Sequence, residues 1–232
     1  EYRLSEKLFE RMKDRAKGVI IAGEPGSGKS TIASAFAEFY LTQRKVVKTV
    51  ESPRDLQLND EITQYSKNFA SSEEIHDILF LSRPDHIIFD EMRATPDFQL
   101  FSDLRLAGSN VLGVLHSSSP IDAVQRFITR LDIGLIPSIL DTILFIEKGT
   151  VGKVLSLKLS VKVPTGMTES DLARPVIEVR DFETGRLEYE IYSYGEQTVV
   201  IQADASEKQS GLNELAKKAI EHELIKYCSA CE

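Results

Sequence analysis

Nine consecutive residues have the types and spacing of a phosphate-binding loop. They satisfy the motif GxxxxGK(S/T) at every fixed position and read Gly23, Glu24, Pro25, Gly26, Ser27, Gly28, Lys29, Ser30 and Thr31. Gly26 and Gly28 permit a backbone whose successive N–H groups point at one anion, and a helix starting at Lys29 adds its positive dipole end. Lys29 can reach the β- and γ-phosphates of ATP, and the Ser30 hydroxyl can bind Mg²⁺. A glycine-rich turn without a ligand is the alternative, and the position of the motif between a predicted strand and a predicted helix disfavours it.

Two adjacent acids, Asp90 and Glu91, follow an apolar run at 86–89. Carboxylates at the C-terminal ends of parallel strands emerge at the ligand-binding edge of the sheet. We expect Asp90 to bind Mg²⁺ and Glu91 to orient or deprotonate the attacking water. A solvated loop is the alternative, but a phosphate-binding loop earlier in the chain makes hydrolysis the favoured interpretation.

Two other strand ends carry groups that would face the same edge. Glu51 ends the run 46–51, and Pro53 then turns the chain away from the sheet. His116 ends the run 111–115, whose tip would lie beside the γ-phosphate if this strand separates the phosphate-loop strand from the Asp-Glu strand. We expect His116 to sense whether the nucleotide is cleaved, with a structural histidine as the alternative. Glu51 is a second candidate catalytic carboxylate.

The elements that must position these groups alternate along the chain. A continuous apolar run at 19–22, which ends in glycine, is typical of a strand buried on both faces of a parallel sheet, and further buried strands are predicted at 46–51, 86–90, 111–115 and 142–147. Helical spacing of apolar residues predicts helices at 2–16, 29–43, 72–82, 97–107 and 120–131. This alternation predicts an α/β protein with a doubly wound, mainly parallel sheet.

The pattern changes after residue 149. Period-two alternation predicts four antiparallel strands at 154–163, 176–182, 187–194 and 198–201. A helix is predicted at 206–228, as the truncated start of a further module. The predicted organisation is therefore an ATPase core with its N-terminal helix at 1–149, a β-rich extension at 150–202 and a C-terminal helix at 203–232.

Composition narrows the class of protein. The chain has 232 residues, of which 42% are apolar and 28% charged, so disorder is excluded. The net charge of −8 argues against a surface that wraps nucleic acid, although basic residues could still line a pore. Apolar runs are far shorter than the ~20 residues of a membrane span. We expect a soluble, cytoplasmic protein, with Cys228 and Cys231 as incidental cysteines rather than a zinc or redox site.

Since the first residue is Glu1, an upstream part is expected to be absent.

Four motifs resemble, in order and spacing, those of the PilT/VirB11-like secretion ATPases. They are the Walker A motif at 23–31, the Asp box at 49–51, the Walker B region at 83–93 and the His box at 113–116. The runs 47–56 and 61–65 are similar to archaeal members that carry a PIN nuclease-like domain upstream and a KH module downstream, some of them linked to Holliday junction branch migration. The resemblance implies a RecA-like P-loop NTPase, a homo-hexameric ring with ATP between subunits, DNA junctions as partner and a PIN domain outside this chain.

The chain also departs from the secretion motors. They usually have glycine where this chain has Asp90 and a second acid where it has Ser52. Whether Glu51 or Glu91 positions the water therefore stays open, and Glu91 is favoured.

Four residues are candidates for an arginine finger, an arginine that reaches the γ-phosphate bound to the neighbouring subunit. They are Arg54, Arg93, Arg105 and Arg130. Arg93 is favoured because the family motif contains it, and an ordinary surface or ion-pair arginine is the alternative for each. The first helix and the segment 150–202 are expected to pack between subunits. Two other functions stay open: a motor acting on protein, as in pilus or secretion machinery, and a nucleotide-dependent scaffold with little turnover.

Overall fold

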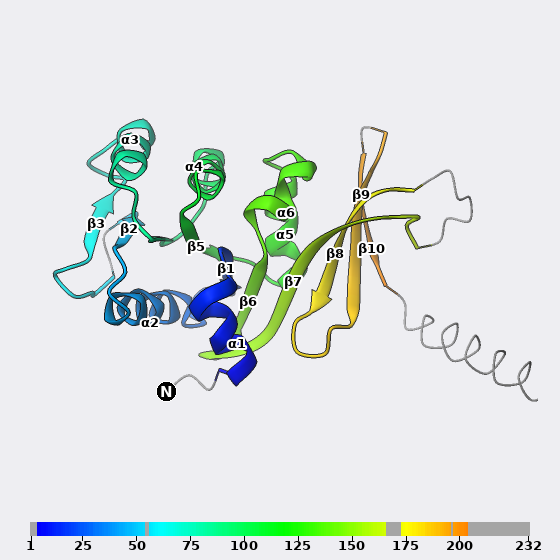
Figure 1. The fold of residues 1–232 in the computed structure, drawn as a ribbon, viewed down its shortest axis with the longest axis horizontal. Helices are drawn as coiled ribbons and strands as arrows, with labels where there is room; N and C mark the ends of the chain where they lie inside the picture. Colours follow the sequence, from blue (N-terminus) through cyan, green and yellow to red (C-terminus); the bar gives the residue numbers. More distant parts are fainter. Residues whose placement is uncertain (1–3, 54–55, 166–172, 196, 204–232) are drawn as a thin grey trace, which may run out of the picture.

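A ten-stranded sheet runs through the whole computed structural model, which describes residues 4–53, 56–165, 173–195 and 197–203 (Figure 1). Its strands are β1 (Gly18–Gly23), β2 (Val47–Glu51), β3 (Thr63–Ser66), β4 (His86–Phe89), β5 (Asn110–His116), β6 (Thr142–Glu147), β7 (Thr150–Lys162), β8 (Arg174–Asp181), β9 (Leu187–Tyr194) and β10 (Gln197–Gln202). They are ordered β10-β9-β8-β7-β6-β1-β5-β4-β2-β3. The six from β6 to β3 pair in parallel, and β7 to β10 are antiparallel.

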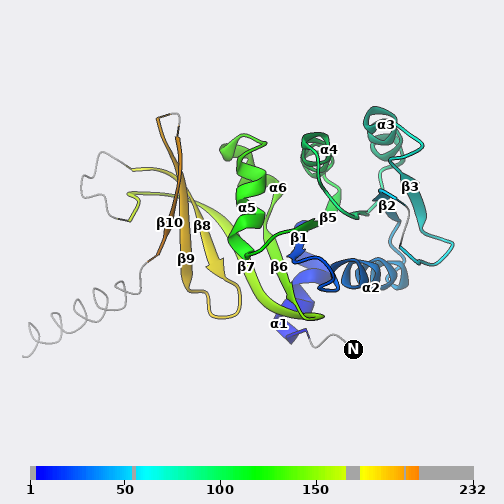
Figure 2. The same cartoon turned by 180° about the vertical axis from the view of Figure 1, so that it is seen from behind.

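Helices cover both faces of the parallel part (Figures 1 and 2). They are α1 (Glu6–Glu10), a π-helical turn (Arg11–Arg15), α2 (Lys29–Thr42), α3 (Ser72–Ser82), α4 (Thr95–Leu106), α5 (Pro120–Ile128), a 3₁₀ turn (Ile133–Leu135) and α6 (Ile136–Ile139). The side chains of β1 alternate between the two cores: Ile20 joins the one under α3 to α6, and Ile21 the one under α1 and α2. The predicted doubly wound sheet is confirmed.

The position of β5 decides which residues can meet. It lies between β1 and β4, with Gly23 of β1 opposite His116 of β5. The carboxyl ends of β1, β5 and β4 therefore carry the phosphate loop, His116 and the Asp90-Glu91 pair side by side. This is the strand arrangement on which the prediction for His116 depended.

Several boundaries differ from those predicted. The strand β3 was missed, because Thr63–Ser66 is a polar, partly exposed edge strand without an apolar run. The predicted helix at 2–16 is a short α1 followed by a π-helical turn in which Met12 is buried, and Ala16, which directly follows the turn, is buried as well. The helix predicted at 97–107 begins at Thr95, and the one predicted at 120–131 ends at Ile128. The short α6 was not predicted.

The strands after residue 149 continue the sheet rather than forming a separate layer. β7 is 13 residues long and pairs with both β6 and β8. Inside this part Lys162 forms ion pairs with Glu178 and the fully buried Glu190 at 2.7 and 2.6 Å. The helix predicted at 206–228 lies outside the described residues, as do both cysteines.

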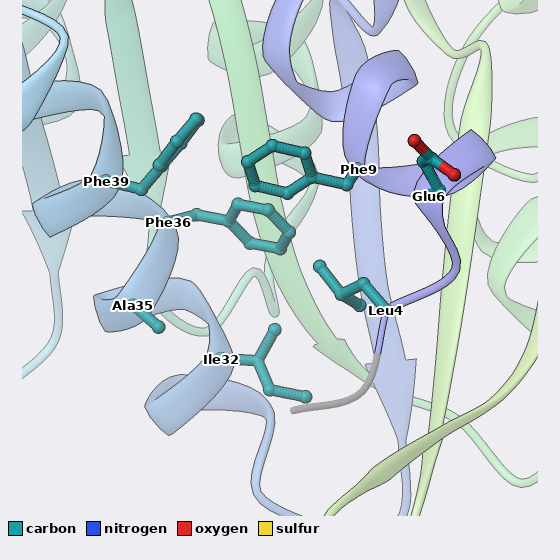
Figure 3. A pocket seen from close by; sticks show the side chains of 7 residues that line it. All are labelled: Leu4, Glu6, Phe9, Ile32, Ala35, Phe36 and Phe39. Atoms are coloured by element: carbon teal, nitrogen blue, oxygen red, sulfur yellow. The ribbon is translucent and has the colours of Figure 1, made fainter. Parts of the chain in front are cut away.

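The first helix is tied to the turn between β8 and β9. Lys7 Nζ donates to the carbonyl oxygens of Phe182 and Glu183, and the Arg11 guanidinium lies 5.3 Å from the Phe182 ring. On its other side α1 forms, with α2, an apolar groove of about 670 Å³ (Figure 3). The groove is lined by Leu4, Glu6, Phe9, Ile32, Ala35, Phe36 and Phe39. Among the described residues, no helix combines the length and apolar character that a bilayer crossing needs.

Candidate functional site

The loop between β1 and α2 has a backbone that only glycine adopts readily. Gly26 and Gly28 have φ values of 74° and 95°, in the left-handed region, and Gly28 is the N-cap of α2. A Cβ added to Gly23 would lie 2.5 Å from the carbonyl oxygen of Ile146. The Gly149 N–H donates to the Ser27 carbonyl at 3.0 Å, so the turn between β6 and β7 supports the loop from outside.

A cavity of about 430 Å³ opens beside this loop. It is lined by Gly26, Gly28, Lys29, Ser30, Thr31, Leu56, Asp90, Glu91, Val114 and His116. The structure therefore brings together the predicted lysine, the two predicted metal ligands and two of the predicted catalytic residues. Gly23, Glu24, Pro25 and Ser27 belong to the loop itself and lie outside the residues lining the cavity.

The ammonium of Lys29 is held against the loop. The residue is 5% exposed, and its Nζ donates to the Glu24 carbonyl at 2.6 Å and to Ser27 Oγ at 3.5 Å. Burial lowers the pKa of Lys29, while the charges of Glu91 and Asp90 act in the opposite direction. An anion in the cavity would give this buried charge a stronger partner than a carbonyl.

Ser30 and Asp90 form the candidate magnesium site. Ser30 Oγ donates to Asp90 Oδ1 at 2.8 Å, and the Asp90 N–H is fixed by the Val50 carbonyl of β2 at 2.9 Å. A hydroxyl from the first turn of α2 and a carboxylate after β4 are hard oxygen ligands, the kind that Mg²⁺ prefers alongside phosphate oxygens and water. The two residues therefore fit the metal that the sequence predicts.

Glu91 is a cavity carboxylate in contact with the predicted sensor, His116. Its Oε1 lies 3.1 Å from His116 Nε2 and forms an ion pair with the Arg93 guanidinium. Burial raises the pKa of Glu91, but the hydrogen bonds and charges of Arg93 and His116 outweigh it and lower the pKa overall. Glu91 is therefore ionised at neutral pH, as a water-orienting carboxylate must be.

The backbone at Glu91 is strained. Its φ is +66°, a value that costs a residue other than glycine on the order of 1–3 kcal/mol and persists only where neighbours enforce it. The enforcing contacts come from Asp97, whose Oδ2 accepts from the N–H groups of Arg93 and Ala94 at 2.8 and 2.9 Å, and from Lys67. Sequence reasoning missed both residues. A cap signal existed for Asp97, three residues after Ala94, but Lys67 is 24 residues from Glu91 and left no local pattern.

Glu51 is buried and is not one of the residues that line the cavity. It is fully buried, and its carboxylate accepts from the Thr49 hydroxyl, from Gln64 Nε2 at 2.9 Å and from the Leu56 N–H at 3.1 Å. Leu56 lines the cavity and Glu51 is not among the lining residues, so a role for Glu51 at the phosphate edge stays a prediction. The hydrogen bonds turn the carboxylate toward the chain that follows β2.

The four candidate finger arginines have different surroundings. Arg105 donates to the carbonyls of Ser109 and Ser138 and is half-buried, so it holds α4 to its neighbours. Arg130 lies over the Phe98 ring at 4.8 Å and donates to a carbonyl of its own helix end. Arg93 has a side chain 68% exposed beside Glu91, and Arg54 lies outside the described residues.

Comparison with known proteins agrees with the resemblance drawn from the motifs. The Type II/IV secretion system protein family matches residues 3–144. The Holliday junction branch migration ATPase PINA of Sulfolobus acidocaldarius is 59% identical over 201 residues, covering 87% of this chain and 39% of that protein. A KH and PIN-domain containing protein of Methanocaldococcus jannaschii is 58% identical, covering 87% of this chain and 31% of that protein. This chain thus spans well under half the length of these relatives.

The fold has a counterpart among solved structures. The pilus retraction motor PilT, solved with bound ADP, superposes with a TM-score of 0.53 at 22% identity, covering 78% of this chain and 51% of that one. At this identity the likeness concerns the fold alone. The chain therefore belongs to the family of Type II/IV secretion system proteins and has the RecA-like P-loop ATPase fold of PilT.

Proposed function

We propose that the chain is the ATP-hydrolysing part of a hexameric ring motor that acts on DNA junctions in the cytoplasm. The observation that carries the proposal is the single cavity in which Lys29, the Ser30–Asp90 pair and the Glu91–His116 pair meet. In this proposal residues 1–149 are the ATPase core, and the strands at 150–202 extend its sheet.

Each group has one task in the proposed reaction. Backbone N–H groups of the phosphate loop and the Lys29 ammonium bind the phosphates, and Ser30 and Asp90 would hold Mg²⁺, which neutralises charge on the β- and γ-phosphates. The Glu91 carboxylate orients a water toward the γ-phosphate. His116 contacts Glu91, so loss of the γ-phosphate would change the environment of both groups together.

The proposed DNA substrate rests on the similarity to PINA. We expect four-way junction DNA to raise the rate of ATP hydrolysis several-fold, because a motor turns over faster on its track. The stimulation should fall steeply between about 50 and 200 mM salt, since phosphate contacts release counterions. Steady-state hydrolysis measured with junction, duplex and no DNA tests this.

The same assay separates the alternatives. Stimulation by pilin-type protein but not by DNA would replace the DNA motor with a motor acting on protein. Slow turnover that neither polymer changes would indicate a scaffold in which ATP sets the shape of the assembly.

The ring proposal requires a site shared between subunits, and Arg93 is an exposed arginine paired with the cavity residue Glu91. We expect Lys29→Ala and Arg93→Ala proteins each to be inactive, and their mixture to regain activity. In a mixed ring the intact phosphate loop of one variant would meet the intact arginine of the other. Hydrolysis measured across mixing ratios tests this, with light scattering to report assembly.

A matched control uses the double variant Lys29→Ala with Arg93→Ala, which should rescue neither single variant. If the mixture of single variants has only the summed activity of its parts, Arg93 acts on its own subunit's Glu91, as their ion pair within the chain already allows.

A further inference from the structure

The strained turn at Glu91 is clamped by an ion pair from outside the four family motifs. Lys67, which directly follows β3, extends its Nζ to Asp97 Oδ1 at 2.8 Å and to the Glu91 carbonyl oxygen at 3.4 Å. The Lys67 and Asp97 side chains are 16% and 8% exposed, so water screens their attraction weakly. The contact joins two segments about thirty positions apart at the base of the catalytic turn.

Asp97 uses its two carboxylate oxygens for different partners. Oδ1 accepts from Lys67, and Oδ2 accepts from the N–H groups of Arg93 and Ala94, the two residues that lead into α4. Before Glu91, the Asp90 N–H donates to the Val50 carbonyl of β2 at 2.9 Å, and directly after it the Met92 N–H donates to the Val114 carbonyl of β5 at 2.8 Å. The backbone is thus held on both sides of Glu91, where a left-handed conformation would otherwise relax.

The clamp also reaches the backbone of Glu51, the second candidate catalytic residue. The Lys67 N–H donates to the Glu51 carbonyl at 2.9 Å, so the backbone of Lys67 is fixed to the end of β2 while its side chain holds the turn. One residue therefore connects the end of β2 to the Glu91 turn after β4.

We propose that Lys67 and Asp97 are positioning residues that hold Glu91 in its left-handed backbone conformation and so aim its carboxylate at the attacking water. This proposal rests on the proposed hydrolysis of ATP. Neither residue lines the cavity, so their removal leaves the groups that bind the nucleotide in place. We expect the effect on turnover to pass through the conformation of Glu91.

The test replaces Lys67 with methionine, which keeps the length of the side chain and removes the ammonium. We expect Lys67→Met to lower kcat about 10-fold, the scale of a misaligned catalytic group, with KM for ATP changed less than about twofold. Lys67→Arg should recover most of the lost turnover, because it restores a cation that reaches Asp97. In a Glu91→Gln background, Lys67→Met should add almost nothing to the loss, since it acts through the missing carboxylate.

Lys48→Met is the matched control. Lys48 is also half-buried and also donates a hydrogen bond in this part of the sheet, to Tyr65 Oη at 3.1 Å, but it lies away from the Glu91 turn. We expect Lys48→Met to keep wild-type kcat. An equal loss of kcat in both variants, or a loss from Lys67→Met that is undiminished in the Glu91→Gln background, would show a general structural role and overturn the proposal.

Hydrogen exchange gives a second measurement that needs no hydrolysis. In Lys67→Met the amides of Arg93 and Ala94 should exchange faster than in the wild-type chain, while the amides of β1 stay unchanged. If the wild-type chain hydrolyses no ATP but exchange at these two amides accelerates, the proposed function fails and the clamp stands. If exchange is unaltered and turnover is normal, the clamp is wrong.

Discussion

Lys29→Ala is expected to abolish ATP hydrolysis, by at least about 10³-fold, the scale of losing a fixed positive charge at the transferred phosphate. In the structure the Lys29 ammonium is buried in the loop and held by a carbonyl and a hydroxyl, poised to exchange these partners for phosphate oxygens. The variant should fold normally. Burial lowers the pKa of Lys29, which means that the folded state disfavours its positive charge. Removal of the Lys29 ammonium should therefore leave the thermal stability unchanged or raise it.

Steady-state phosphate release and a thermal melt of the same sample measure both parts of this result. Lys45→Ala, which removes an exposed lysine just after α2, is the control and should retain full turnover. Wild-type hydrolysis by a folded Lys29→Ala protein would disprove the assignment of the phosphate loop.

Glu91→Gln is expected to slow hydrolysis by about 10²-fold or more while leaving ATP affinity intact. Glutamine has the same shape and can still meet His116, but it cannot accept a proton or attract a water as a carboxylate does. Single-turnover hydrolysis together with binding of a fluorescent nucleotide separates the chemical step from affinity. The low pKa of Glu91 also predicts that wild-type turnover is retained as pH falls from 7 toward the ordinary range of a glutamic acid.

Glu51→Gln provides the comparison that decides between the two carboxylates. Since Glu51 is buried among the donors Thr49, Gln64 and the Leu56 N–H, its replacement should lower the free energy of unfolding by about 1–3 kcal/mol. Its effect on kcat should be smaller than that of Glu91→Gln. The reverse order of kcat losses would make Glu51 the group that positions the water.

The strands that could be predicted from the sequence are those whose burial on both faces produces an apolar run. The apolar runs of β1, β4, β5 and β6 come from strands covered on both faces, and a strand with one face in water would alternate instead. The polar edge strand β3 has neither an apolar run nor alternation. It is a strand because it pairs with β2, and this pairing cannot be predicted from the residues of β3 alone.

The residues of the candidate site also fall into those that local sequence spacing predicts and those whose setting depends on tertiary contacts. Lys29, Ser30, Asp90 and Glu91 could be found because their chemistry is tied to fixed spacing within a loop or a strand end. The direction in which Glu51 points depends on Gln64, and the setting of Arg105 depends on carbonyls from two other segments. The clamp from Lys67 joins residues about thirty positions apart. Such contacts depend on tertiary packing, and no periodic pattern in the sequence predicts them.

The unbroken sheet has a mechanical consequence. Shear between neighbouring strands would break the ladder that joins β6 to β7, so the antiparallel strands turn with the phosphate loop as one stiff arm. The hydrogen bond from Gly149 to Ser27 fastens the root of this arm to the loop itself. β10 stands four strand spacings from β6, about 19 Å, so a tilt of about 10° at the nucleotide would displace its edge by about 3 Å. The outer strands would thus enlarge a small rotation at the nucleotide into a larger displacement at the edge of the sheet.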